Sequence, residues 1–546
     1  MKQFLKKTSA LLLAALLAAP VSAAIPGEYW QYHQPYIDAC EAGNHTEIIE
    51  IGRKIEEIML KYPLDIDTGA NLGNVYNRSA AAHLALAEYE EASEAHANYV
   101  PYAEYLGFKD AVIVSTAAAR RLDLGTAVYA ETSDLSVVPD YNALYEPDNG
   151  IYYGKVAGKP TENESATLFY FEFLDDKIAD FDWFLRPIDD EGDRVIEIAM
   201  NMPRENDSLK EVMNKKNDKY IIETMKYIAT LESPVLLRIG GEMNVWGNLA
   251  EPELFKQAFR KLANTARKYC PNAAIVFSPN FVSNFYVNVN DYYPGDEYVD
   301  WVGLSLYATR YMNAATLREA TEPEKLFYSS GDYANMIAQM AEIVELYGDR
   351  KPIMISESGA SHSINGKDNV DLTAFATRQL KILYTYINMV YPQVKCILHF
   401  DTNLGAANSY DFSLKGNKTV KELWEALTAD SVFLTGLKDT AGKAYVKAQD
   451  YSGRDEKIKL YTYCVLPGNP ETTVTYIYDG APVYETKTMP YACALRASSI
   501  KDGEHTLTVK IVGADGYEKA IDMKLTKAEG VVTIDDAAAP AVTPAQ

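Results

Sequence analysis

Between residues 150 and 428 the sequence alternates short apolar runs with longer amphipathic stretches. In the amphipathic stretches apolar residues recur every three or four positions, as in a helix; Phe255, Phe259 and Leu262 thus share one face of residues 253–269. Repeated strand–helix alternation predicts an α/β fold with a parallel sheet, and eight repeats match a (β/α)8 TIM barrel. The eight runs are residues 151–156, 166–173, 194–200, 235–239, 274–278, 299–306, 352–356 and 395–400.

One interval in this pattern is too short. Only residues 157–165 separate the first two runs, whereas a crossover between parallel strands takes about a dozen residues or more. Either the first crossover helix is degenerate or the first strand lies elsewhere. We place the barrel domain at residues 126–428.

Two regions of different character flank the barrel. Residues 24–125 show helical periodicity, and the segment around Tyr89 resembles part of a tetratricopeptide repeat, although no second copy follows at a spacing of about 34 residues. This region is either a helical cap on the barrel or a repeat domain. Residues 429–530 alternate with period two between turn signals, which predicts an immunoglobulin-like β-sandwich. The Ala- and Pro-rich residues 531–546 are expected to be disordered.

Residues 1–23 have the pattern of a signal peptide. Lys2, Lys6 and Lys7 precede an apolar run over residues 10–19, and Val21-Ser22-Ala23 offers small residues for cleavage. The apolar run is shorter than the ~20 residues of a membrane span, and no other stretch in the sequence suits one. We therefore expect a secreted protein without a membrane span, located extracellularly, in a periplasm or at the cell surface.

Charge and cysteine content exclude several classes of function. The chain has 52 basic and 76 acidic residues, a net charge of −24, which becomes −27 once the three lysines of the leader are removed. Nucleic acid or an anionic bilayer is a poor partner for a chain this acidic. The five cysteines are too few and too scattered for a disulfide framework; Cys464 and Cys493 lie in one strand-rich region and either pair or stay free. No histidine or cysteine spacing matches a metal site, so we expect no metal and no cofactor.

Two carboxylates follow predicted strands at the same end of the barrel. In a (β/α)8 barrel the active site lies at the C-terminal ends of the strands. Glu242 follows the fourth run and Glu357 follows the seventh. Either residue alone is as easily a salt-bridge partner, for example of Arg238, but two carboxylates on strands four and seven favour catalysis.

Paired carboxylates at this end of the barrel suit glycoside hydrolysis. One of them is held protonated and donates to the leaving oxygen, while the other stays ionised and attacks the anomeric carbon. A separation of ~5–5.5 Å between them would indicate a retaining mechanism through a covalent glycosyl-enzyme. Tyr307, at the end of the sixth run, is placed to hydrogen-bond Glu357 and hold it charged.

Other candidate residues follow the same strands. Asn244 and Trp246 come just after Glu242, and an exposed indole is well shaped to stack on a sugar ring. Asn280, after the fifth run, and Arg238 either bind sugar hydroxyls or brace the barrel.

The sequence around these residues resembles glycoside hydrolase family 26, whose members include β-mannanases. The resemblance covers roughly residues 150–428. Its most specific part runs from Tyr292 to Gly303, and it extends to residues 238–246, 274–280 and 351–359.

This resemblance implies that Glu242 is the acid/base, Glu357 the nucleophile and Tyr307 its support. The chain departs from the family at two places. Family members usually carry His immediately before the acid/base Glu, where this chain has Gly241. The region after the eighth strand lacks the expected Trp, for which His399 or an aromatic residue from another loop would have to serve. The catalytic pair is therefore better supported than mannan as the substrate.

The sequence leads to one hypothesis and one alternative. The hypothesis is a secreted retaining endo-β-glycosidase that hydrolyses a β-linked polysaccharide, with β-mannan as the first guess. The alternative is a surface glycan-binding or cell-wall scaffold protein with an inactive barrel. In either case the N-terminal helices or the C-terminal sandwich offer surfaces for a protein or cell-wall partner.

Overall fold

The apolar runs form the strands of a closed parallel barrel in the computed structural model, which describes residues 25–123, 126–202, 207–246, 250–281, 287–309, 322–328, 331–366, 370–407 and 409–537. Pairing proceeds in the order β2-β3-β4-β5-β6-β7-β9-β12, and β12 pairs with β2 to close the ring. The predicted run 299–306 occupies one position in the barrel but is divided into two strands, β7 and β8. β7 pairs with the start of β9, and β8 pairs with the second half of β9. The barrel strands are β2 (Ile151–Val156), β3 (Ala166–Glu172), β4 (Val195–Asn201), β5 (Val235–Ile239), β6 (Ala273–Phe277), β7 (Trp301–Val302), β8 (Ser305–Ala308), β9 (Ile353–Ala360) and β12 (Val394–His399). The predicted TIM barrel is confirmed.

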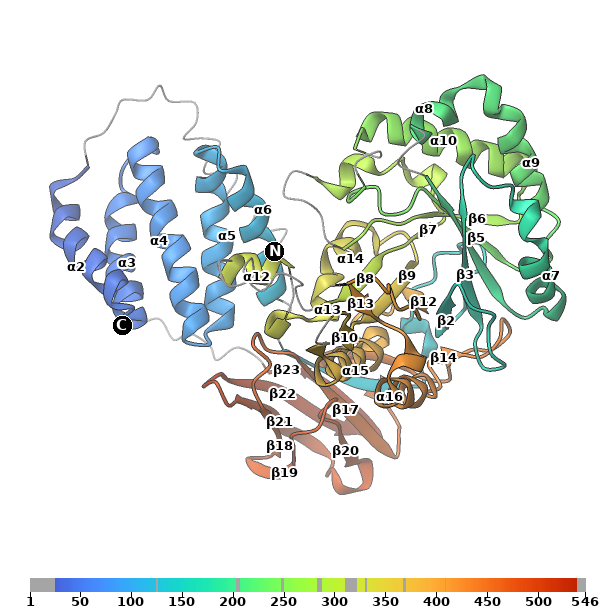
Figure 1. Ribbon diagram of the computed structural model, residues 1–546. Helices are drawn as coiled ribbons and strands as arrows, with labels where there is room; N and C mark the ends of the chain where they lie inside the picture. Colours follow the sequence, from blue (N-terminus) through green and yellow to red (C-terminus); the bar gives the residue numbers. More distant parts are fainter. Residues whose placement is uncertain are drawn as a thin grey trace.

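Amphipathic helices cover the outside of the barrel (Figure 1). Their apolar faces are buried as the spacing predicts: Phe255, Phe259 and Leu262 of α10 are fully covered. The first crossover, residues 157–165, contains no helix, and β2 lies at the predicted residues. Of the two explanations for the short interval, the missing crossover helix is therefore the correct one. The covering helices are α7 (Asp182–Glu191), α8 (Ser208–Met213), α9 (Asp218–Ile228), α10 (Pro252–Tyr269), α13 (Met336–Gln339), α14 (Ala341–Tyr347), α15 (Thr373–Val390) and α16 (Lys418–Thr428), whereas α12 (Glu322–Tyr328) packs against α6 (Lys109–Asp123) of the N-terminal helices.

Helices precede the barrel, and each contacts the next one along the chain. Two of them begin at side-chain caps, where Asn44 and Asp65 accept hydrogen bonds from backbone N–H groups three residues later. The last two helices join the rest of the molecule: Glu90 accepts a 3.0 Å hydrogen bond from Tyr517, and Arg120 pairs with Glu345 at 2.8 Å. The tetratricopeptide resemblance stays a prediction. These helices are α2 (Trp30–Ala42), α3 (His45–Met59), α4 (Ile66–Ala85), α5 (Tyr89–Tyr105) and α6 (Lys109–Asp123).

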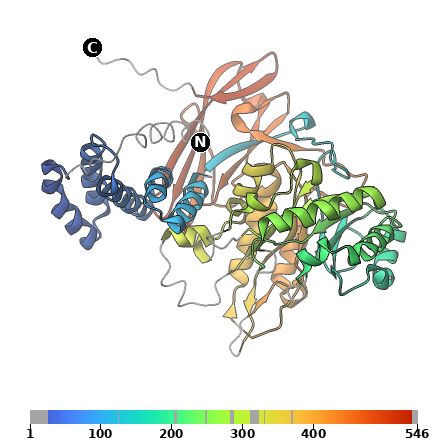
Figure 2. The same ribbon diagram turned by 90° about the horizontal axis from the view of Figure 1, so that it is seen from above.

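Two antiparallel sheets at the C-terminal end of the chain share one apolar core. The first sheet has the order β15-β1-β17-β20 and the second the order β16-β23-β22-β21-β18-β19. Figures 1 and 2 show this sandwich against both the helical region and the barrel. Its strands are β1 (Thr126–Thr132), β15 (Ala444–Lys447), β16 (Ser452–Gly453), β17 (Lys457–Cys464), β18 (Thr472–Tyr478), β19 (Ala481–Thr486), β20 (Cys493–Arg496), β21 (Gly503–Gly513), β22 (Glu518–Ala528) and β23 (Val531–Asp536).

The sandwich corrects two boundaries expected from the sequence. Residues 126–132 form β1 of the sandwich instead of the start of the barrel, because Val128 and Ala130 face the core between the two sheets. Residues 531–536 are not disordered: they form β23, where Val532 and Ile534 alternate into the same core. The expected signal peptide and the end of the tail, residues 538–546, lie outside the described residues.

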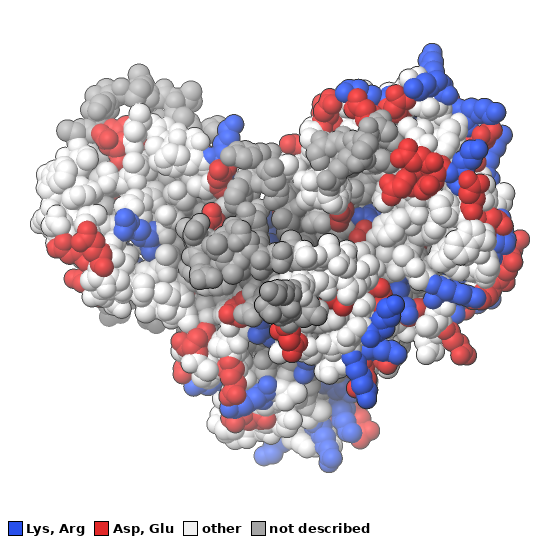
Figure 3. All heavy atoms as spheres, viewed as in Figure 1, with Lys and Arg blue, Asp and Glu red and all other residues white. Residues whose placement is uncertain are grey.

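Cysteines, membrane spans and surface charge complete the description. All five cysteines are free, Cys464 and Cys493 included. In the part of the chain that the structure describes, no helix combines the length and apolarity of a bilayer span. On the face shown in Figure 3, acidic and basic side chains intermingle over the barrel helices and are sparse over the N-terminal helices. The excess of acidic residues therefore forms no single patch on this face.

Candidate active site

Glu242 lies in a tight turn at the C-terminal end of β5. The turn passes through left-handed backbone at Gly240 (φ 54°) and again at Glu242 (φ 58°), a conformation that is rare for a residue with a side chain. The Glu242 N–H donates to the Ser278 carbonyl at 2.8 Å, which ties the turn to the end of β6. The asparagine amides continue this connection: Asn244 Nδ2 donates to the Asn280 carbonyl, and Asn280 N donates to Asn244 Oδ1, each at 2.8 Å.

The environment of Glu242 favours a proton on its carboxyl group. Burial raises its pKa, and the negative charge of Glu357 raises it further, while Arg238 acts in the opposite direction. Two neighbours fix its position: Asn280 Nδ2 donates to Oε1 at 2.8 Å and Trp246 Nε1 donates to Oε2 at 3.0 Å. A half-buried, oriented carboxyl group with a raised pKa can act as a general acid.

Glu357 has the opposite environment. Its carboxylate is 8% exposed on β9 and forms an ion pair with Nη1 of Arg238. The Tyr307 hydroxyl donates to its other oxygen at 2.7 Å. Burial and the charge of Glu357 hold the pKa of Tyr307 well above 10, so this hydroxyl keeps its proton and stays a donor. Glu357 thus has a cation on one oxygen and a hydroxyl donor on the other, which are the partners that suit a nucleophilic carboxylate.

Arg238 occupies the barrel interior between the carboxyl groups. Its guanidinium is 2% exposed, and Nη2 donates to Ser305 Oγ at 2.9 Å. A third carboxyl group, Glu197 on β4, lies fully inside the barrel; burial raises its pKa to about 7 although the positive charge of Arg238 lowers it. Tyr170 on β3 completes the group, and burial with the charge of Glu357 raises its pKa well above 10.

The structure brings seven of the eight residues predicted from the sequence to this one place. Asn244 is 3% exposed, and both ends of its amide bond Asn280, so it braces the turn instead of presenting itself to a ligand. Trp246, at 41% exposure, is open to solvent beside Glu242. The residues brought together are Arg238, Glu242, Asn244, Trp246, Asn280, Tyr307 and Glu357.

His399 is not part of this group. Side chains alternate along β12, so Leu398 points into the barrel and His399 points outward. The imidazole is fully buried against Trp424 of α16, with Nε2 3.2 Å from the Phe412 carbonyl, and burial lowers its pKa to about 4. The expected substrate contact at His399 is therefore wrong.

Three residues of the site were missed by sequence reasoning. Ser305, Glu197 and Tyr170 all lie on strands, whereas the strand-end rule considers only positions at or beyond the strand ends. For Glu197 there was a signal: a carboxylate at the middle of the apolar run Val-Ile-Glu-Ile-Ala is out of place unless a buried cation faces it. Within the described ranges, no cluster of three or more metal-ligand side chains is present.

Residues 191–380 match the sequence model of glycosyl hydrolase family 26. This central part of the barrel is therefore similar to family 26. No match is found among curated proteins. Solved structures similar to the chain include a family 26 β-mannanase from Bacteroides ovatus, with 13% identity over 54% of this chain and 92% of that one at a TM-score of 0.37. A family 26 protein from Muricauda sp. MAR_2010_75 has 15% identity over 61% of this chain and 93% of that one, also at a TM-score of 0.37. The family match over residues 191–380 indicates a glycosidase.

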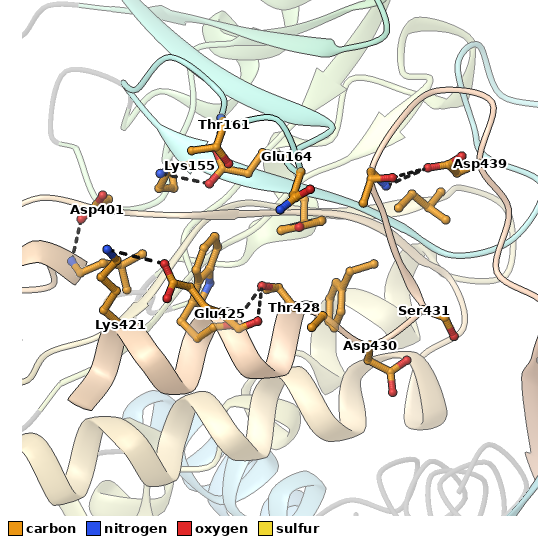
Figure 4. Close-up of a pocket in the computed structure, with 18 of the residues that line it drawn as sticks. Lys155, Thr161, Glu164, Asp401, Lys421, Glu425, Thr428, Asp430, Ser431 and Asp439 are labelled. Carbon is orange, nitrogen blue, oxygen red and sulfur yellow. Dashed lines mark hydrogen bonds and ion pairs between the residues drawn. The ribbon is translucent and has the colours of Figure 1, made fainter. Parts of the chain in front are cut away.

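A groove of about 830 Å³ opens on the flank of the barrel, between β2 and α16 (Figure 4). It lies beside residues 157–165, where the crossover helix is missing. Four of its charged groups form ion pairs: Lys155 pairs with Glu164 at 3.0 Å and Lys421 with Glu425 at 3.6 Å. Its aromatic floor is 5% exposed or less at every ring, which leaves no open face for stacking; the rings are Tyr153, Trp424 and Phe433. The groove is therefore a consequence of the missing helix and separate from the catalytic group.

Proposed function

We propose that the chain is a secreted retaining endo-β-glycosidase that hydrolyses a β-linked polysaccharide, β-mannan first. Glu242 is the acid/base and Glu357 the nucleophile. The observation that carries the proposal is the opposite environment of the two carboxyl groups, since one is biased toward its protonated form and the other is paired with a guanidinium and a phenol. The family 26 match supports the same reaction class.

The reaction proceeds in two displacements. In the first, the Glu357 carboxylate attacks the anomeric carbon, the glycosidic bond breaks, and the Glu242 proton moves to the leaving oxygen. In the second, ionised Glu242 takes a proton from water, the resulting hydroxide attacks the anomeric carbon, and the ester to Glu357 breaks. Trp246 Nε1 and Asn280 Nδ2, which donate to Glu242, stabilise its ionised form between the two steps.

The substrate is a neutral polysaccharide chain. Beside the catalytic pair, Trp246 has an exposed indole that offers a face for a sugar ring. The position before Glu242 carries no side chain, so the acid/base side of the site differs from that of the family's usual members. For this reason the substrate is proposed as a class, with mannan and glucomannan tested first.

A substrate panel tests the function. The protein without residues 1–23 is incubated with mannan, glucomannan, mixed-linkage β-glucan and β-1,3-xylan, and new reducing ends are measured. We expect release from at least one polysaccharide, loss of release by more than about 10³-fold in Glu357→Ala, and normal release in Glu425→Ala, an exposed carboxylate on α16. Hydrolysis that persists in Glu357→Ala contradicts the assignment of the nucleophile.

Two further outcomes separate the finer parts of the proposal. Nuclear magnetic resonance of the first product shows retention as the β-anomer, and an α-anomer would indicate inversion instead. A wild-type protein that binds one of these polysaccharides in an affinity gel but releases no reducing ends is a glycan-binding protein, not an enzyme. Detection of the mature protein outside the cytoplasm, with its N-terminus near residue 24, tests the proposed export.

A further inference from the structure

Gly241, the residue before Glu242, lies directly against the guanidinium of Arg238. A Cβ atom added at Gly241 would come within 2.7 Å of both Cζ and Nη2 of Arg238, and closer still to Nε. The backbone of Gly241 is not in the left-handed region, unlike that of Gly240. A side chain at residue 241 is thus excluded by lack of space and not by backbone conformation.

The guanidinium has little freedom to move away. Nη1 pairs with Glu357 and Nη2 donates to Ser305, and the group is buried within the barrel. Its remaining edge, Nε, has no hydrogen-bond partner among the described residues and faces Gly241. Any atom at this position therefore presses on a guanidinium whose two other nitrogens are already held by Ser305 and Glu357, and displaces it from that geometry.

We propose that Gly241 is a positioning residue: the absent side chain sets Arg238 against Glu357. The role rests on the proposed function, in which Glu357 is the nucleophile. A histidine at residue 241 has no room beside Arg238 where the guanidinium now lies. Restoring His at this position is therefore harmful in this chain, not beneficial.

The first experiment compares Gly241→Ala and Gly241→His with the wild type on glucomannan. A charge-assisted hydrogen bond to a carboxylate is lost when the guanidinium moves, so we expect kcat to fall by about 10- to 100-fold while KM changes by less than about threefold. Gly158→Ala is the matched control, because a Cβ there would meet nothing nearer than 4.0 Å. A wild-type kcat in Gly241→Ala, or a higher one in Gly241→His, overturns the inference.

A double-mutant cycle shows whether Gly241 acts through Arg238. Arg238→Lys keeps the positive charge beside Glu197 and Glu357 but lacks the guanidinium atoms that face Gly241. In that background we expect Gly241→Ala to change kcat by less than about threefold. If Gly241→Ala costs as much in the Arg238→Lys background as it does with the arginine present, the two positions are independent and the inference fails.

The same cycle is read by stability, which does not require a substrate. Urea unfolding should show a lower midpoint for Gly241→Ala with the arginine present and an unchanged midpoint in the Arg238→Lys background. Absence of hydrolysis in the wild type together with this coupled midpoint would reject the proposed function and retain the packing of Gly241 against Arg238. Equal midpoint losses in both backgrounds would reject the packing itself.

Discussion

Glu197 is expected to make the barrel less stable as the pH rises through neutrality. Its carboxyl group is fully buried, and burial raises its pKa from the usual 4.5 to about 7. The folded protein therefore holds this proton more tightly than the unfolded chain does. Between these two pKa values stability falls as the pH rises, and above about pH 7 the loss is complete.

The size of the effect follows from the pKa of Glu197. At about 1.4 kcal/mol for each pKa unit, full ionisation costs about 3 kcal/mol of folding free energy, of which about 2.5 kcal/mol lies between pH 5 and pH 8. Glu197→Gln has nearly the same shape and no ionisation. Relative to the wild type, its free energy of unfolding should rise by about 2.5 kcal/mol between these two pH values.

Tryptophan fluorescence during urea unfolding at pH 5 and pH 8 measures this difference. The signal reports mainly on the barrel, because four of the five tryptophans lie in the barrel region and only Trp30 lies outside it; the four are Trp183, Trp246, Trp301 and Trp424. Glu223→Gln, on the outside of α9, serves as the control and should show no pH-dependent difference. A constant difference between Glu197→Gln and the wild type at both pH values would refute the reasoning, because it would mean that Glu197 does not change ionisation in this range.

Two other predictions follow from single contacts. Asn280→Ala removes the hydrogen-bond donor to Glu242 Oε1, which stabilises the charged carboxylate. The pKa of Glu242 should therefore rise further, and the alkaline limb of the kcat/KM profile should move to higher pH. A move to lower pH would contradict this role of the hydrogen bond. His96 in α5 is fully buried, and burial lowers its pKa to about 4. Because the unfolded chain binds this proton more tightly, the free energy of unfolding decreases as the pH falls from 6.5 toward 4. Between pH 7 and pH 4.5, His96→Leu should lose about 2.5 kcal/mol less of this free energy than the wild type. Urea unfolding followed by circular dichroism measures the difference. Equal acid losses in the two proteins would show that folding does not lower the pKa of His96.

The barrel could be predicted because each of its strands is buried on both faces. Such strands are continuous apolar runs, and β2 and β5 begin and end at the predicted residues. The strand-end rule then located Glu242 and Glu357, because it depends only on chain direction in a parallel sheet. Features that depend on side-chain direction were harder to predict from the sequence. His399 lies at a strand end, as Glu242 and Glu357 do, but its side chain points outward from β12 and packs among the helices.

The boundaries of the domains were unpredictable for a different reason. β1 precedes the barrel in sequence but pairs with β17, more than 300 residues later. When a strand pairs only with residues this distant in sequence, the neighbouring residues do not indicate which domain it belongs to. The same holds for β23, whose alternation of Val532 and Ile534 is short and adjoins an Ala- and Pro-rich tail.

The site is best understood as one cation shared among three carboxyl groups. Among the described residues, Arg238 is the single guanidinium in contact with this group, and it forms its ion pair with Glu357 alone. Burial acts on the other two, so the pKa of Glu242 is raised and that of Glu197 reaches about 7. The one positive charge pairs with one carboxylate, and in the proposed reaction that carboxylate is the one that attacks. In the proposed mechanism, residues that hold the guanidinium against Glu357, with Gly241 among them, therefore keep Glu357 as the nucleophile and leave Glu242 as the acid.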